Sequence, residues 1–168
     1  MKTKTKMITY VAIFSALICV LSVVAFPTPW GVPFTLQTFI IALAGFSLGK
    51  KYGTFCVLIY LLLGAIGLPV FAGLTGGIGK FVSVTGGFLY GFIFLCFFCG
   101  YNKLIFSFLG LFICHLLGVL QFSFLTKNTI LQSVLIVSLP YVIKDVLSLI
   151  LAYFIGKKIK KHTDNFIC

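Results

Sequence analysis

Lys144 and Asp145 are adjacent ionisable residues inside an apolar run of the sequence, "SLPYVIKDVLSLILAYF". An ionisable group within an apolar span is costly unless it is paired or faces a wet cavity. A carboxylate accepts hydrogen bonds and a lysine donates them, so both residues are candidates for binding a polar ligand. We do not expect them to pair with each other, because adjacent side chains on a helix point about 100° apart.

The other reactive side chains favour structural roles. His115 lies in an apolar run and is predicted to pack with a hydrogen bond, whereas His162 belongs to a basic tail. The motif "CFFC" at 96–99 has the spacing of a redox or zinc half-site, but no second CxxC accompanies it. The six cysteines are therefore interpreted as small apolar residues. The sequence predicts no metal and no cofactor. It also predicts no enzyme, which would need a cluster of His, Asp or Glu.

The stretch "PVFAGLTGGIGKFVSVTGG", residues 69–87, is rich in glycine like a phosphate-binding loop. A Walker loop has the pattern G-x-x-x-x-G-K-[ST]. Here Leu74 takes the place of the first glycine and Phe81 that of the hydroxyl, so no nucleotide is predicted. Backbone of this kind near a membrane must be buried in protein or line a cavity. We expect a wall or lid of a binding pocket, with these residues offering hydrogen bonds or close backbone approach: Thr75, Gly76, Gly77, Lys80, Ser83 and Thr85.

Composition indicates the class of protein that must position these residues. Hydrophobic residues make up 61% of the chain and charged residues 9%, against roughly 45–50% and 25% in soluble domains. The sequence therefore predicts an integral membrane protein. Nucleic acid is not an expected partner in spite of the net charge of +11, because the lysines lie in short clusters between apolar runs rather than on one face.

Six apolar segments qualify as membrane-spanning helices, which need about 20 residues each. They cover residues 8–26, 33–48, 52–66, 86–99, 104–124 and 138–155, and the second to fourth are short. The basic start lacks a cleavage site of small residues, so the first segment is predicted to be a retained helix and not a signal peptide. The expected architecture is an all-α membrane protein with one domain over residues 1–168.

The lysines predict the orientation of this bundle. With an even number of spans both termini lie on one side. The opposite side then holds only Lys80 and Lys127, and Lys144 lies near a helix entrance. The side with the termini collects Lys2, Lys4, Lys6, Lys50, Lys51, Lys103, Lys157, Lys158, Lys160 and Lys161. Because cytoplasmic loops carry an excess of lysine and arginine, both termini are predicted to be cytoplasmic and the glycine-rich stretch to face outward.

Three motifs resemble a known family: "VPFTLQTFIIALAGFSLGKKYG", "LIYLLLGAIGLPVFAG" and "TGGFLYGF". They are similar to the biotin-binding S components of energy-coupling factor transporters, the BioY family, and the resemblance resumes at "LPYVIKD". It implies a six-helix bundle in the bacterial cell membrane with cytoplasmic termini. It also implies an outward-facing biotin pocket, formed by the loop between the third and fourth helices and by the outer ends of the fourth and sixth.

The resemblance also implies site residues. Asp145 matches the family's aspartate after a proline-led turn, and Thr75 matches a polar position that contacts the ligand. Ser148 stands where the family commonly has a lysine, and Lys144 where it often has glycine. The partner of the biotin carboxylate therefore stays open between Lys80, Lys144 and a cluster of neutral hydroxyl and backbone groups.

Biotin's own chemistry extends the predicted site. Its ureido ring presents two N–H donors and a carbonyl acceptor, which Asp145, Thr75 and Gln37 are expected to meet. Its thiophane ring and valeryl chain suit aromatic walls. The candidates for these walls are Trp30, Phe71, Phe88 and Tyr90.

Ala12 and Ala16 in "AIFSA" lie on one face of the first helix. In the family such small residues dock on a transmembrane coupling protein, because they permit close helix approach. No nucleotide motif is present, so the predicted partners also include ATPase subunits. Two alternatives remain: an S component for another small vitamin, and an ion-coupled secondary transporter with Asp145 as its proton site. No inverted repeat supports the latter.

Overall fold

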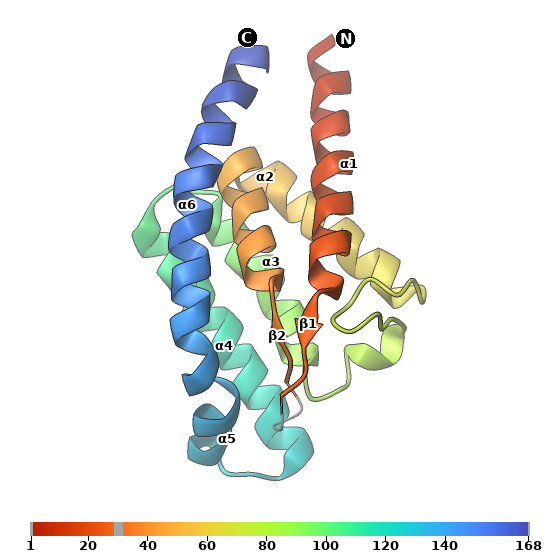
Figure 1. Ribbon diagram of the computed structural model, residues 1–168, viewed down its shortest axis with the longest axis vertical. Coiled ribbons are helices and arrows are strands. Elements are labelled where there is room, and N and C mark those ends of the chain that lie inside the picture. Colours follow the sequence, from red (N-terminus) through yellow and green to blue (C-terminus); the bar gives the residue numbers. More distant parts are fainter. Residues whose placement is uncertain (1, 29–31, 168) are drawn as a thin grey trace.

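The computed structural model describes residues 2–28 and 32–167 (Figure 1). The described residues form an all-α bundle with one small hairpin. In chain order its elements are α1 (Lys2–Val23), β1 (Ala25–Phe26), β2 (Phe34–Thr35), α2 (Gln37–Ala65), the 3-10 helix η1 (Ile78–Lys80), α3 (Gly86–Cys99), α4 (Leu104–Thr126), α5 (Ile130–Val137) and α6 (Leu139–Ile167). The predicted helical class is confirmed.

Helix α2 contains both the second and third predicted spans, with no separate loop between them. Its continuity breaks at Gly49, whose φ of 75° and ψ of 175° suit glycine alone. Beyond this bend the chain folds back on itself. A Cβ added at Gly53 would lie 2.9 Å from the oxygen of Ala44 and 2.9 Å from the Cα of Gly45. A single glycine thus makes the reversal between the second and third predicted spans, 33–48 and 52–66.

The segment after α1 forms a hairpin instead of extending the first span to residue 26. Strands β1 and β2 pair antiparallel, with Ala25 opposite Thr35 and Phe26 opposite Phe34. Tyr141 of α6 holds this hairpin, because its hydroxyl contacts the Thr28 hydroxyl at 3.0 Å and donates to the oxygen of Val32. The hairpin is therefore anchored over the start of α6.

Helix α5 is an additional short element between α4 and α6. Thr129 and Gln132 form a capping box: the Thr129 hydroxyl accepts from the Gln132 N–H at 3.3 Å, and Gln132 Oε1 accepts from the Thr129 N–H at 3.2 Å. Helix α6 follows directly, with Pro140 in its first turn as predicted.

Both termini lie at the same end of the bundle, and the α4–α5 connection lies at the opposite end (Figure 1). Four helices of the described chain are long and apolar enough to cross a membrane: Thr5–Val23, Gln37–Ala65, Leu104–Thr126 and Leu139–His162. Helix α3 is a shorter apolar helix. Among the cysteines that the structure describes, Cys19 is half-buried and the other four are buried.

Glycines bring α3 unusually close to α4. A Cβ added at Gly87 would lie 2.2 Å from the oxygen of Leu117, and one at Gly91 would lie 2.6 Å from the Cα of Cys114. On α4, Gly118 packs in the same way against the ring of Phe88. These close contacts fix the relative position of α3 and α4. Side chains from both helices line the cavity described next.

Candidate functional site

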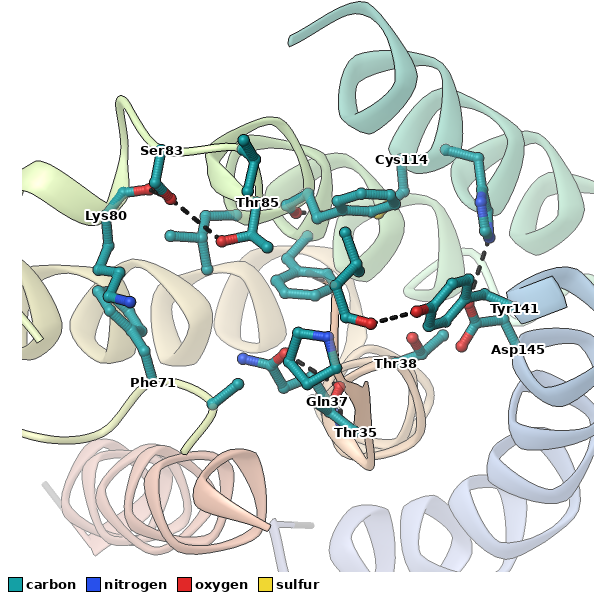
Figure 2. A pocket seen from close by; sticks show the side chains of 18 of the residues that line it. Thr35, Gln37, Thr38, Phe71, Lys80, Ser83, Thr85, Cys114, Tyr141 and Asp145 are labelled. Atoms are coloured by element: carbon teal, nitrogen blue, oxygen red, sulfur yellow. Dashed lines mark hydrogen bonds and ion pairs between the residues drawn. The ribbon is translucent and has the colours of Figure 1, made fainter. Parts of the chain in front are cut away.

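A cavity of about 200 Å³ lies between the hairpin, the glycine-rich loop and the adjoining parts of α2, α3, α4 and α6 (Figure 2). This volume is below the roughly 300–1,000 Å³ of pockets for drug-sized ligands, so the cavity suits a compact small molecule. Its polar lining comprises Thr35, Gln37, Thr38, Thr75, Lys80, Ser83, Thr85, His115, Tyr141, Lys144 and Asp145. The cavity is thus lined by both regions that the sequence analysis identified, the glycine-rich loop and the start of α6.

Asp145 is a buried carboxylate in the cavity lining and is only 6% exposed. Its Oδ2 accepts from His115 Nε2 at 3.2 Å, and His115 Nδ1 in turn contacts the Ser138 hydroxyl at 3.1 Å. Figure 2 shows Thr38 beside the Asp145 carboxylate. A carboxylate offers about four acceptor positions, so acceptor capacity remains for a ligand beside the contacts with His115 and Lys144.

Lys144 pairs with Asp145, so the expectation that these neighbours would not pair is wrong. Lys144 Nζ lies 2.5 Å from Asp145 Oδ1 and also donates to the backbone oxygen of Thr35 at 3.0 Å. The lysine side chain is long enough to reach the neighbouring carboxylate although the two Cβ atoms point in different directions. It is only partly exposed to solvent. Its charge is thereby engaged at the Asp145 side of the cavity.

Lys80 reaches the cavity from the side opposite Asp145 (Figure 2). It belongs to η1 in the glycine-rich loop and is half-buried. Gln121 of α4 fixes this part of the loop, because its Nε2 donates to the oxygens of Phe81 at 2.8 Å and Ser83 at 2.7 Å. The Ser83 hydroxyl lies 3.2 Å from that of Thr85, and both line the cavity.

The loop is packed on its inner side, as expected of a wall. Phe71 is 3% exposed and makes edge contacts with Tyr60 and Phe81 at ring-centre distances of 5.4 and 5.8 Å. Ile78 and Val82 point outward, with 75% and 70% of their surface exposed. The loop is thus an amphipathic cover rather than a flexible connection.

Gln37 and Phe88, both predicted to belong to the site, line the cavity. Gln37 Nε2 donates to the Tyr60 hydroxyl at 2.7 Å, and its Oε1 accepts from the Thr35 hydroxyl at 3.0 Å. Phe88 makes an edge contact with His115 at 5.9 Å. Thr75 also lines the cavity, and its hydroxyl donates to the oxygen of Ala72 at 3.0 Å.

Four predicted residues lie outside the cavity lining. Gly76 packs against the backbone of Leu68, and Gly77 has a φ of 98° and donates its N–H to the oxygen of Gly64 at 2.7 Å, so both shape the loop. Tyr90 is 40% exposed on the outer side of α3. Ser148 is half-buried one turn beyond Lys144 on α6. Trp30, the remaining aromatic candidate, lies outside the described residues.

The sequence analysis missed Thr35, Thr38 and Tyr141, and it assigned His115 to packing alone. His115 is indeed hydrogen-bonded, but it also lines the cavity. The motif "PFTLQT" carried a signal for the threonines, since three polar residues cluster where an apolar span begins. The position of His115 depends on how α4 packs against α6, which no local pattern encodes.

These features define a class: a multi-pass membrane protein with a shielded cavity for one small polar molecule. The chain matches the BioY family over residues 1–165 and therefore belongs to that family.

Similar proteins agree with this assignment. The biotin transporter BioY of Thermotoga maritima is 40% identical over 158 residues, which cover 89% of this chain and 92% of that protein. The probable biotin transporter BioY of Pyrococcus horikoshii is 34% identical over 95% of this chain and 99% of that protein. These relatives are named as transporters and not as enzymes, which confirms that expectation.

A solved structure supports the fold. The crystal structure at 2.1 Å of the S-component for biotin from an ECF-type ABC transporter superposes with a TM-score of 0.86 and 32% identity. The match covers 95% of this chain and 93% of that one. The all-α bundle described above is therefore the S-component fold.

Proposed function

We propose that this protein captures biotin from outside the cell as the S component of an energy-coupling factor transporter. The observation that carries this proposal is the pairing of Asp145 with His115 and Lys144 at one side of a small cavity, with Lys80 at the other (Figure 2). Biotin has a hydrogen-bonding ureido ring at one end and a carboxylate at the other, so its polar groups are distributed in the same way.

The ureido ring is assigned to the Asp145 side. The free acceptor positions of the carboxylate suit the two ureido N–H groups, and Thr38 and Gln37 lie close by to serve the carbonyl. Phe88, Phe71 and Leu89 supply apolar surface for the thiophane ring and the chain. A buried polar site of this kind rejects analogues that leave its groups unpaired.

The carboxylate of biotin is assigned to Lys80. Of the two cationic candidates, Lys144 is already engaged with Asp145 and with the oxygen of Thr35. Lys80 stands across the cavity from this pair, near the hydroxyls of Ser83 and Thr85. These hydroxyls can add hydrogen bonds to the same carboxylate.

Calorimetric titration of the purified protein with biotin, desthiobiotin, thiamine and riboflavin tests the ligand. We expect tight binding of biotin, weaker binding of desthiobiotin, which keeps the ureido and carboxylate groups, and none of the other two. Affinity should not change with sodium. Binding of thiamine or riboflavin in place of biotin would assign the fold to another vitamin, and strict sodium or proton dependence would favour a secondary transporter.

The proposal also includes the number of membrane passes and the side of the membrane on which the termini lie. The two halves of α2, 37–48 and 50–65, are treated as separate passes, which gives six passes in all with α1, α3, α4 and α6. Both termini are assigned to the cytoplasm, because the lysines concentrate at their end of the bundle. The short passes then fit a locally thinned membrane or a tilted arrangement.

Docking on a coupling protein is assigned to α1. Ala12 and Ala16 are exposed, and they form a row with Ile8 and Val20, which are 69% and 66% exposed. The spacing of four residues places this row on one face of the helix, where small side chains allow another helix to approach closely. ATPase subunits would supply the energy for transport.

Ala16→Trp is expected to keep biotin binding and to lose most of the uptake, because the indole blocks close helix approach on an exposed face. Radiolabelled biotin uptake in cells with the partner subunits, together with co-purification of the coupling protein, measures both effects. Leu17→Trp on a neighbouring exposed position is the matched control. Normal uptake and complex formation in Ala16→Trp would show that docking uses another face.

A further inference from the structure

A second hollow lies on the outside of the bundle, far from the cavity described above. It is a groove of about 380 Å³ between the second half of α2 and α3. Its walls are Lys50, Lys51, Thr54, Phe55, Leu58 and Phe97. It begins at the bend of α2, toward the end of the molecule that carries both termini (Figure 1).

The walls of this groove change from cationic to apolar along α2. Lys50 and Lys51 stand at its start, and Phe55 and Leu58 follow at distances of about 6 to 12 Å along the helix axis. Phe55, Leu58 and Phe97 are 49%, 44% and 38% exposed, so their surface is open to the membrane. A phospholipid has the same order of parts, with a phosphate at the interface and acyl chains below it.

The apolar floor continues beyond the groove. On α2, Leu58 is followed on the same face by Leu62, which is 64% exposed. On α3, Phe97 is preceded one turn away by Phe94, which is 45% exposed. These two rows extend the apolar surface, so that it reaches Leu62 at about 18 Å from Lys50 along the helix axis.

The lysines at this end outnumber the acids that could balance them. The sequence has thirteen lysines and two acids. One of these acids, Asp145, is paired with Lys144 at the far end of the bundle. Lys50 Nζ lies 4.5 Å from the centre of the Tyr101 ring and Lys51 Nζ 5.7 Å from that of Tyr52, contacts that hold the ammonium groups without neutralising them.

We infer that this groove binds one anionic phospholipid. Its phosphate is held by Lys50 and Lys51, and one acyl chain lies against Phe55, Leu58 and Phe97. Each lysine near a membrane surface contributes to the attraction of anionic lipid. Because Lys50 and Lys51 are held next to an apolar surface, they can bind one lipid molecule at a defined position. The inference rests on membrane insertion and is independent of the ligand in the central cavity.

Native mass spectrometry of the full chain, released from detergent containing dioleoyl phosphatidylglycerol or dioleoyl phosphatidylcholine, tests the site. We expect one phosphatidylglycerol to be retained in preference to phosphatidylcholine. The double variant Lys50→Gln and Lys51→Gln should weaken this retention about 10- to 30-fold. Leu58→Trp, which fills the groove and keeps both charges, should lower retention as well.

The matched control is Lys157→Gln with Lys158→Gln. It removes the same charge from exposed lysines at the same end, and Lys157 makes a comparable ring contact, 4.3 Å from the centre of Tyr153. This control should retain the lipid. An equal loss of phosphatidylglycerol retention in both double variants would show only a general attraction between lysines and anionic lipid. Displacement of the lipid by inorganic phosphate alone would exclude a site for the acyl chain. Unchanged retention combined with lost co-purification of partner subunits would assign the groove to a protein contact. Any of these three results overturns the inference.

Discussion

Asp145→Asn is expected to weaken biotin binding on the order of 100-fold, the largest effect of any single side chain in the cavity. The amide keeps the size of the carboxylate but offers one oxygen instead of two, and that oxygen carries no charge. It would have to serve His115, which now donates at 3.2 Å, as well as the ureido N–H groups. Calorimetry or fluorescence titration of the purified variant measures the change.

Lys80→Met supplies the comparison that separates the two sides of the cavity. It should weaken biotin about tenfold and have little effect on biotin methyl ester, whose carboxylate is masked. Asp145→Asn should weaken both ligands by a similar factor. The melting temperature of each variant is recorded to exclude unfolding. If Asp145→Asn binds biotin like the unmodified protein, its carboxylate serves α4–α6 packing, and the ureido group lies elsewhere.

Prediction of the fold succeeded where periodicity and composition carry the information. The helical class, the common side of the termini and the proline-led start of α6 were all accessible from the sequence. The break between the second and third predicted spans was accessible too, because the gap between them begins with Gly49, the residue that makes the turn. The hairpin was missed because its strands are two residues long and depend on Tyr141, which is more than 100 residues away in the chain.

Several predicted site residues with an unusual local context in the sequence line the same cavity. Asp145, Lys80 and Thr75 interrupt apolar or glycine-rich sequence, and all three line the cavity. Tyr90 was predicted for the cavity wall and lies outside the lining, because the sequence of a short aromatic-rich helix does not indicate which face is inward. The role of His115 required knowledge of the contact between α4 and α6, which the chain makes only after folding.

That dependence on helix packing leads to the second large effect, at the contact between α3 and α4. Gly91→Leu is expected to destabilise the protein by about 3 kcal/mol and to lower its melting temperature by roughly 10 °C. Even a Cβ at this position would lie 2.6 Å from the Cα of Cys114, so the two helices must separate. Gly91→Ala should give an intermediate change.

Separation of α3 from α4 should also reduce biotin affinity, although Gly91 does not line the cavity. Phe88 comes from α3 and His115 from α4, and they meet edge to face across the contact that the glycines permit. Gly79→Ala is the matched control, because a Cβ there would meet nothing within 4 Å. A Gly91→Leu protein with unchanged melting temperature and unchanged biotin affinity would disprove the idea that close α3–α4 packing builds the site.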